Sequence, residues 1–279
     1  MTFATMGDYN PEMTLRIRKA TLTVATILGD YMEDLVVVGG LVPSLLIPPT
    51  KLPAGAENHA GTLDLDLGLG LAILNDQRYK GIAQRLRETG FYPDTKEGGN
   101  EVRQRWTHGQ DSSVKIEFLI PPANHEVLPG NLQSLESDLA AFITDGLEVA
   151  FQNRVNVQLN DTTLLGESVS REILVCNPGA FVVLKALAFR NRGNFKDAYD
   201  LYYLTRNYGK GVEDVASYLD PLVRTRPGQK AIDILKEDFL DERAIGPMRV
   251  ARFATRDEDA DIQADVVGFI SDLLQEVRR

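Results

Sequence analysis

The stretch Leu63-Asp64-Leu65-Asp66-Leu67-Gly68-Leu69-Gly70 alternates between leucine and a polar or small residue. A period of two predicts a β-strand over residues 63–71, because successive side chains of a strand point to opposite faces. The leucines would cover one face and pack against the core. The two aspartates would share the other face, with their Cα atoms roughly 6.6 Å apart at about 3.3 Å of rise per residue.

A second strand with the same alternation is predicted from Val114 to Ile120, and its polar face carries Lys115 and Glu117. If the two strands pair, Glu117 joins Asp64 and Asp66. Each pair of carboxylates at such spacing repels by on the order of 2–3 kcal/mol at an effective dielectric near 20. A cation should therefore be present, and carboxylate oxygens favour Mg²⁺ or Mn²⁺. The alternation alone also fits an ordinary half-exposed strand, so the motif by itself leaves both interpretations open.

A short β-branched run, Leu35–Val38, precedes the aspartates and ends at Gly39-Gly40. This pattern predicts a buried strand followed by a glycine turn. Backbone N–H groups at such a turn can seat a phosphate, particularly where a helix begins. A simple tight turn is the alternative interpretation.

Helical spacing predicts helices over residues 11–29, 41–47 and 76–89, and again over most of the chain after Pro178. The later helices are expected at 178–190, 194–208, 212–222, 228–239 and 262–277. Further strands are expected at 102–106, 155–159, 162–165 and 173–176. The change of pattern near residue 177 predicts a domain boundary there. The fold class is therefore α/β (α+β), a mixed sheet flanked by helices and followed by a helical domain.

The composition is that of an ordinary globular protein, with 43% hydrophobic and 25% charged residues and a single cysteine, Cys176. No apolar run is long enough for a transmembrane helix, and no secretory signal pattern is present. We therefore expect a cytoplasmic protein with no membrane partner. The net charge of −10 disfavours general nucleic-acid binding.

One segment, residues 185–210, reverses this acidic character with six basic and two acidic side chains, and it could hold a phosphate locally. Within it, Lys196 and Asp200 are spaced i, i+4 on a predicted helix. They could equally form a plain surface ion pair. The basic residues of the segment are Lys185, Arg190, Arg192, Lys196, Arg206 and Lys210.

Together these motifs resemble the nucleotidyltransferase superfamily, and within it the AbiEii/AbiGii-type toxin family. The resemblance rests on Val37-Val38-Gly39-Gly40, on residues 59–67 with their Asp-Leu-Asp, and on Lys115-Ile116-Glu117. It rests also on Lys185-Ala-Leu-Ala-Phe-Arg190 followed by Lys196-Asp197-Ala198-Tyr199-Asp200. The resemblance spans about residues 30–205 and implies a nucleotidyltransferase-like domain over 1–176 and a helical domain over 177–279.

The resemblance also implies roles for individual residues. Asp64, Asp66 and Glu117 would bind the metal and, with Lys185 and Asp197, form the catalytic set. The residues expected to bind the nucleotide are Gly39, Gly40, Thr62, Lys115, Arg190, Lys196 and Asp200.

The expected function is metal-dependent transfer of a nucleoside monophosphate from an NTP to an RNA, protein or small-molecule acceptor. The resemblance further implies the toxin of a toxin–antitoxin system, with an antitoxin protein as a possible partner. A degenerate protein that binds nucleotide or a partner without turnover is the alternative. It is motivated by Glu117 in place of aspartate and by the long segment, including the proline-rich 48–55, between Gly40 and Asp64. A third class, a two-carboxylate glycoside hydrolase, would act without metal.

Overall fold

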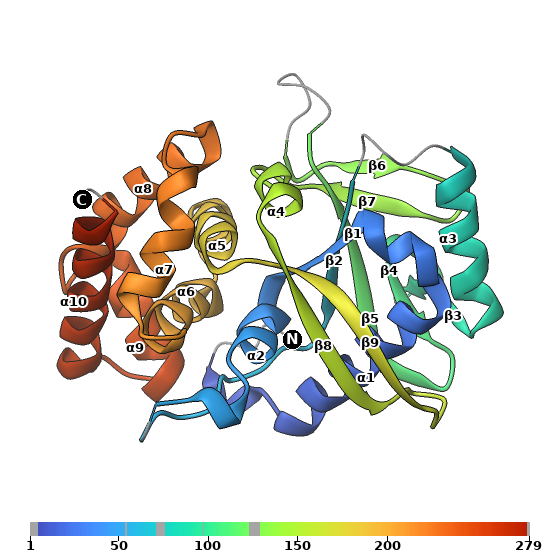
Figure 1. Ribbon diagram of the computed structural model, residues 1–279, viewed down its shortest axis with the longest axis horizontal. Coiled ribbons are helices and arrows are strands. Elements are labelled where there is room, and N and C mark those ends of the chain that lie inside the picture. The colour runs from blue at the N-terminus through green and yellow to red at the C-terminus, as the bar shows by residue number, and fades with distance from the viewer. Residues whose placement is uncertain (1–4, 54, 71–75, 97, 123–128, 278–279) are drawn as a thin grey trace. The chain divides into compact units, whose positions relative to one another are not determined.

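The computed structural model describes residues 5–53, 55–70, 76–96, 98–122 and 129–277. By its contacts the chain divides into two compact units (Figure 1). The sheet unit comprises Pro11–Leu41 and Thr62–Cys176, and the helical unit comprises Met1–Asn10, Val42–Gly61 and Asn177–Arg279. Two segments from the first quarter of the chain thus pack with the C-terminal helices. The domain limits 1–176 and 177–279 stay a prediction.

The sheet unit contains one mixed sheet, and its described strands run in the order β3-β4-β5-β2-β1-β9-β8. β2 pairs with β1 in antiparallel and with β5 in parallel orientation. β7 pairs with β5 in parallel and with β6 in antiparallel orientation. The strands are β1 (Leu35–Val38), β2 (Leu65–Leu69), β3 (Phe91–Thr95), β4 (Glu101–His108), β5 (Asp111–Ile120), β6 (Leu132–Ser134), β7 (Ala140–Ile143), β8 (Arg154–Thr162) and β9 (Ser168–Cys176).

The α-helices that the structure describes in this unit are α1 (Pro11–Leu28), α3 (Asp76–Glu88) and α4 (Glu148–Gln152). α1 contacts β2, β5, β8 and β9, and α4 contacts β1 and β9. Leu65, Leu67 and Leu69 are fully buried, as their alternation predicts. On the opposite face of β2, a Cβ added at Gly68 would lie 3.0 Å from Cγ1 of Val36 and 3.3 Å from the ring of Phe151 in α4, which leaves little room for a side chain.

The helical unit is built from α2 (Val42–Leu46), α5 (Pro178–Arg192), α6 (Phe195–Asn207), α7 (Val212–Leu219), α8 (Arg226–Phe239), α9 (Ile245–Thr255) and α10 (Ala260–Glu276). The N-terminus of α5 is capped by the Asn177 side chain, which accepts a hydrogen bond from the Ala180 N–H. α5 contacts α6, α7 and α8, and most of its side chains are buried. No described helix has the combined length and apolar character needed to traverse a bilayer.

The mixed sheet and the C-terminal helices confirm the predicted fold class, and most predicted elements form within a few residues of their expected ends. Two differences have local causes. Residues 162–165, expected as a strand, form the end and turn of the β8–β9 hairpin, with Gly166 at a φ of +85°. The helix α9 was missed because Gly246 and Pro247 look like breakers, yet they occupy its first turn, where proline is tolerated. The short β3, β6, β7 and α4 were also missed, and residue 71 lies outside the described residues.

A close backbone approach at Gly179 yields a test of this packing. A Cβ at this position would lie 2.1 Å from the carbonyl oxygen of Tyr218 on α7. We expect Gly179→Ala to lower the free energy of unfolding by about 1–3 kcal/mol, since backbone atoms cannot yield as a flexible side chain can. Urea denaturation followed by circular dichroism measures the change.

Gly268→Ala provides the matched control, because nothing lies within 4 Å of a Cβ added in the middle of α10. Helix propensity should make this variant neutral or more stable by up to about 1 kcal/mol. Equal stability losses in both variants would contradict the packing at Gly179.

Candidate functional site

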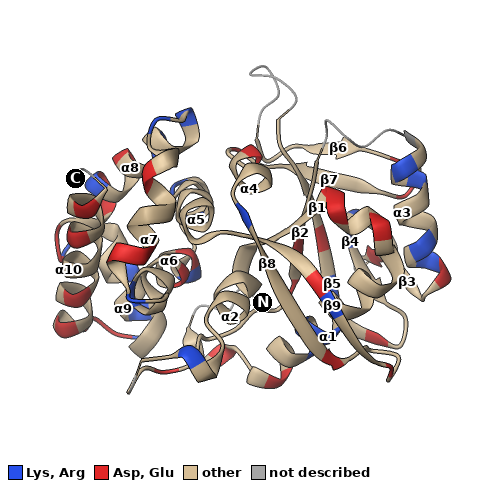
Figure 2. Ribbon diagram, viewed as in Figure 1, with Lys and Arg blue, Asp and Glu red and all other residues tan. Residues whose placement is uncertain are grey.

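Parallel pairing of β2 and β5 brings the predicted acidic residues together. Asp66 lies opposite Glu117 in the register of the two strands, and Asp64 immediately precedes β2. Acidic residues occur on several strands of the sheet unit (Figure 2). One carboxylate oxygen from each of Asp64, Asp66 and Glu117 lies within 4.8 Å of the others, and all three residues are half-buried. The alternation in the sequence therefore identified residues that converge in space.

Thr62, predicted to bind nucleotide, orients the first of these acids. Its hydroxyl donates to Oδ1 of Asp64 at 3.1 Å, and its own N–H donates to the Thr14 hydroxyl of α1 at 3.1 Å. Thr62 is 3% exposed. Its hydroxyl therefore holds the Asp64 side chain in place.

Gly39 permits the second acid to approach the turn after β1. Val38 pairs with Asp66 across β1 and β2, and the next residue, Gly39, has a φ of +73°. A Cβ on Gly39 would lie 1.8 Å from Oδ2 of Asp66. Position 39 thus requires glycine for two reasons. One is the backbone conformation, and the other is the carboxylate that lies against it. Gly40 follows within the same short helical turn, Gly39–Leu41.

The donor set of this cluster fits a divalent metal ion. Three carboxylates at such distances repel one another by roughly 3 kcal/mol per pair at an effective dielectric near 20. Hard oxygen ligands at partial burial suit Mg²⁺ or Mn²⁺. Asp64, Asp66 and Glu117 are therefore the residues of the described chain that could hold such an ion.

Arg105 of β4 supplies a counter-charge that the sequence analysis missed. Its Nε donates to Oε1 of Glu117 at 2.6 Å, and its Nη2 lies 2.6 Å from the same oxygen. Burial lowers the pKa of Arg105, but the charge and hydrogen bond of Glu117 outweigh this effect and raise it, with Asp64 adding to the rise. Arg105 faces Glu117 directly across β4 and β5, so cross-strand pairing was the signal that could have revealed it.

Lys115, a predicted nucleotide ligand, pairs with Asp94 of β3. The Lys115 Nζ lies 2.5 Å from Oδ2 of Asp94. Burial raises the pKa of Asp94, but the hydrogen bond and charge of Lys115 outweigh it and hold this pKa below its usual value.

Four of the five predicted residues of the helical unit form a buried ion network between α5 and α6. Nζ of Lys185 lies 2.9 Å from Asp197 and 2.7 Å from Asp200, and Nζ of Lys196 lies 2.6 Å from Asp200. None of these four side chains is more than 9% exposed. Lys196 and Asp200 are therefore an interior pair rather than the surface pair that their i, i+4 spacing allowed.

Charge attraction dominates within this network. Burial raises the pKa of Asp200 and of Asp197, but neighbouring cations, Lys185 first, outweigh it and hold both well below the usual value. Burial lowers the pKa of Lys185, and the two aspartates reverse this shift. The pKa of Lys196 is lowered, chiefly by burial.

Two further members of the network lay outside the predicted site. Arg192 donates from Nε to Oδ2 of Asp197 at 2.6 Å. His59 donates from Nε2 to Oδ1 of Asp200 at 2.8 Å, while its Nδ1 accepts from the N–H of Gly61 at 3.1 Å. Those two partners fix the neutral Nε2–H tautomer. Burial, followed by the charge of Lys196, lowers the pKa of His59 to about 4.

Aromatic residues of α6 hold the segment that carries His59. The Tyr199 ring stacks on His59 with centroids 5.4 Å apart, and its hydroxyl accepts a hydrogen bond from the N–H of Ala60. The Tyr203 hydroxyl donates to the carbonyl oxygen of Glu57 at 3.0 Å. Residues 57–61 are thus attached to α6 through both backbone and side chains.

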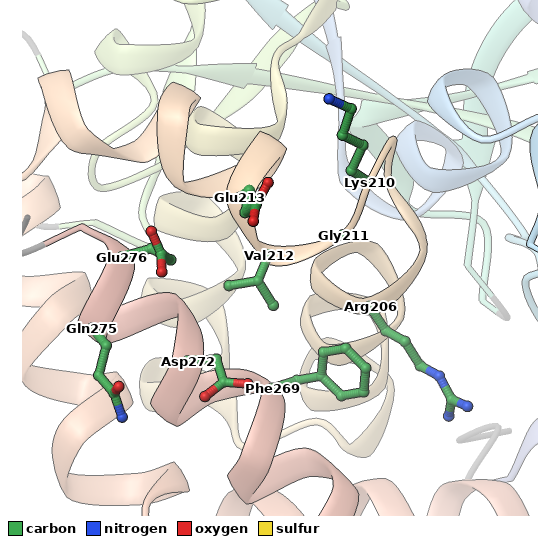
Figure 3. A pocket seen from close by; sticks show the side chains of 9 residues that line it. All are labelled: Arg206, Lys210, Gly211, Val212, Glu213, Phe269, Asp272, Gln275 and Glu276. Atoms are coloured by element: carbon green, nitrogen blue, oxygen red, sulfur yellow. The ribbon is translucent and has the colours of Figure 1, made fainter.

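The remaining basic residues of the 185–210 segment lie in other surroundings. Arg190 pairs with Glu237 and Asp238 of α8 at 2.8 and 2.9 Å. Arg206 and Lys210 border a surface hollow of about 380 Å³ (Figure 3). Acidic Glu213, Asp272 and Glu276 also line this hollow, and it contains none of the predicted site residues. The basic segment is therefore divided among the buried network, the α8 pairs and this hollow.

Comparison with known proteins adds one finding to this geometry. The family model described as "Nucleotidyl transferase AbiEii toxin, Type IV TA system" matches residues 62–279, which is more than half of the chain. The matched range includes the three acids and most of the buried network, whereas Gly39, Gly40 and His59 precede it. No curated protein matches the chain.

The approach of Gly39 to Asp66 leads to a prediction about metal binding. We expect Gly39→Ala to weaken Mn²⁺ binding at least about tenfold, because the new Cβ must displace a carboxylate of the cluster. The left-handed backbone should also cost about 1–2 kcal/mol of stability. Mn²⁺ titration by calorimetry and thermal denaturation measure the two effects.

Gly166→Ala separates these effects, since Gly166 has a φ of +85° with nothing within 4 Å of an added Cβ. This control should lose stability without losing Mn²⁺ affinity. Unchanged affinity in Gly39→Ala would contradict the steric argument.

The lowered pKa of His59 predicts a pH dependence of stability. Between pH 7.5 and 5 the unfolded chain protonates His59 near pH 6.5, while the folded chain keeps it neutral down to about pH 4. The unfolded state therefore binds a proton that the folded state does not. The free energy of unfolding falls as the pH is lowered, by about 2 kcal/mol at pH 5. His59→Gln should lack this component. Urea denaturation of both proteins at the two pH values gives the difference, and equal losses would contradict a buried neutral His59.

Proposed function

Because the chain belongs to the AbiEii family of nucleotidyl transferase toxins of type IV toxin–antitoxin systems, we propose that it transfers a nucleoside monophosphate from an NTP to an acceptor. The convergence of Asp64, Asp66 and Glu117 is the observation that carries this proposal. Membership of the family also implies an antitoxin partner. The reaction would use Mg²⁺ or Mn²⁺ and release pyrophosphate.

The sheet unit supplies the groups that would hold the metal ion and the phosphates. Asp64, kept in place by Thr62, and Asp66, lying against Gly39, would offer carboxylate oxygens together with Glu117. A bound divalent ion would neutralise charge on the α-phosphate and favour attack by an acceptor hydroxyl. The N–H groups of the turn at Gly39 and Gly40 would seat phosphate oxygens.

In the helical unit, catalytic roles for Lys185 and Asp197 and nucleotide binding by Arg190, Lys196 and Asp200 stay predictions. The buried pairing supports a first role in fixing α5, α6 and residues 57–61 relative to one another. A catalytic role for Lys185 would require its ammonium to exchange an aspartate partner for a phosphate oxygen. The same holds for Lys196.

The charge of the protein bears on the acceptor class, which is RNA, protein or a small molecule. The net charge of −10 and the mixed charges of the helical unit disfavour a long nucleic acid, whose phosphates normally require a broad basic surface. A protein or small-molecule hydroxyl, or a short RNA end, is compatible with this charge.

A transfer assay with each α-³²P-labelled NTP, Mg²⁺ and separate RNA, protein and small-molecule acceptors tests the proposal. We expect Asp66→Asn to reduce transfer at least about a hundredfold, because it removes one ligand charge from the metal site. Asp111→Asn is the matched control, since Asp111 lies on the same β5 strand as Glu117 but pairs with Arg16. Equal activity in Asp66→Asn and wild type would refute the proposed site.

The second candidate function is nucleotide or partner binding without turnover. The ion pair of Arg105 with Glu117 favours it, because a guanidinium already neutralises the third acid. NTP binding with Mg²⁺ in calorimetry, together with no label transferred to any acceptor class, would select this alternative over the transferase.

A further inference from the structure

We propose that Arg105 is a positioning residue that holds Glu117 as a ligand of the metal ion, and that Asp94 and Lys115 in turn hold Arg105. The inference rests on the proposed function, since it presumes that the three acids bind a metal ion. It assigns a role to Arg105 and Asp94, and it gives Lys115 a role different from nucleotide binding.

The guanidinium contacts of Arg105 select one oxygen of Glu117. Both Nε and Nη2 lie 2.6 Å from Oε1. A metal ion could therefore be ligated through Oε2 without breaking either contact. A carboxylate held by its other oxygen in this way has a fixed orientation, as ligands supported by outer-shell hydrogen bonds generally do.

An irregularity in strand pairing accompanies this placement of Arg105. Pro93 of β3 pairs with Trp106 of β4, but the next residue, Asp94, pairs with Val102. Residues 103–105 of β4 thus form a bulge, and the indole N–H of Trp106 donates to the Arg103 carbonyl within it. Bulges commonly redirect side chains beside functional sites. Here the bulge ends at Arg105.

A chain of alternating charges includes Arg105. Its Nη1 lies 3.8 Å from Oδ2 of Asp94, and the same Asp94 oxygen lies 2.5 Å from Nζ of Lys115. Asp94 thus contacts both Arg105 and Lys115, while Arg105 contacts both Asp94 and Glu117. The ion pairs that link Lys115, Asp94, Arg105 and Glu117 connect three adjacent strands. They restrict the orientation of the Arg105 guanidinium.

Two possible roles of Arg105 have opposite consequences for metal affinity. If Arg105 were only a counter-charge, its removal would leave the acids more negative and tighten the binding of a divalent cation. If Arg105 positions Glu117, its removal weakens binding, because the ligand loses its orientation. Lysine at this position separates the roles further, since it keeps the charge but loses the planar fork.

The test is Mn²⁺ titration of the full-length chain by calorimetry and by electron paramagnetic resonance, without nucleotide. We expect Arg105→Lys and Arg105→Gln each to bind Mn²⁺ about tenfold more weakly than wild type. Asp94→Asn should show a smaller loss in the same direction. Arg103→Gln is the matched control, because Arg103 lies two residues away on β4 and bonds to Ser134 and Ser137 instead. It should bind Mn²⁺ as wild type does.

Unchanged or tighter Mn²⁺ binding in Arg105→Gln, or wild-type binding in Arg105→Lys, would overturn the positioning role while leaving the metal site standing. Equal weakening in Arg103→Gln would overturn it too, because the loss would then follow from any disturbance of β4. If wild type itself binds no Mn²⁺, the metal site and the positioning role fall together. Should Arg105→Gln fail to fold, Arg105→Lys alone decides between these outcomes.

Discussion

The parallel pairing of β2 with β5 is the constraint on which the candidate site depends, because it sets Asp66 directly beside Glu117. The leucine face of β2 stabilises this pairing, because its leucines are fully buried. The polar side is unfavourable by roughly 3 kcal/mol for each close carboxylate pair. The burial of one strand face thus stabilises a concentration of negative charge on the other, which a bound cation would relieve. Arg105 relieves part of it without a metal.

In the helical unit, by contrast, oppositely charged side chains pair with one another in the interior. Asp200 accepts contacts from two lysines and a neutral histidine, and Asp197 from Lys185 and Arg192. Buried pairs gain little net stability over apolar packing, yet breaking one by removing a partner is strongly unfavourable. Such a network therefore specifies which segments meet, and here it joins α5, α6 and the residues before Gly61.

Sequence reasoning predicted the parts of this structure that depend on local pattern. Alternation revealed β2 and β5, and the resemblance placed Lys185, Asp197 and Asp200 in one motif that the structure does bring together. Sequence reasoning missed the contacts that depend on partners distant in sequence. Arg105 reaches Glu117 only through strand register and a bulge. The surroundings of Lys196 were equally hidden, since its spacing from Asp200 is the same in a surface pair and in a buried one.

The helical motif could act in a transferase either by binding nucleotide directly or as a purely structural network. The burial of Lys185 and Lys196 distinguishes these two roles. Lysines that bind a triphosphate directly usually need access to it, whereas these two already contact aspartates at less than 3 Å with side chains under 10% exposed. Exchange of partners would leave a buried aspartate without its cation, which is strongly unfavourable unless the aspartate moves too. Direct contact with nucleotide therefore implies rearrangement of the whole network, including the hydrogen bond of His59. A purely structural network implies none, so nucleotide binding should alter the environment of His59 only in the first case.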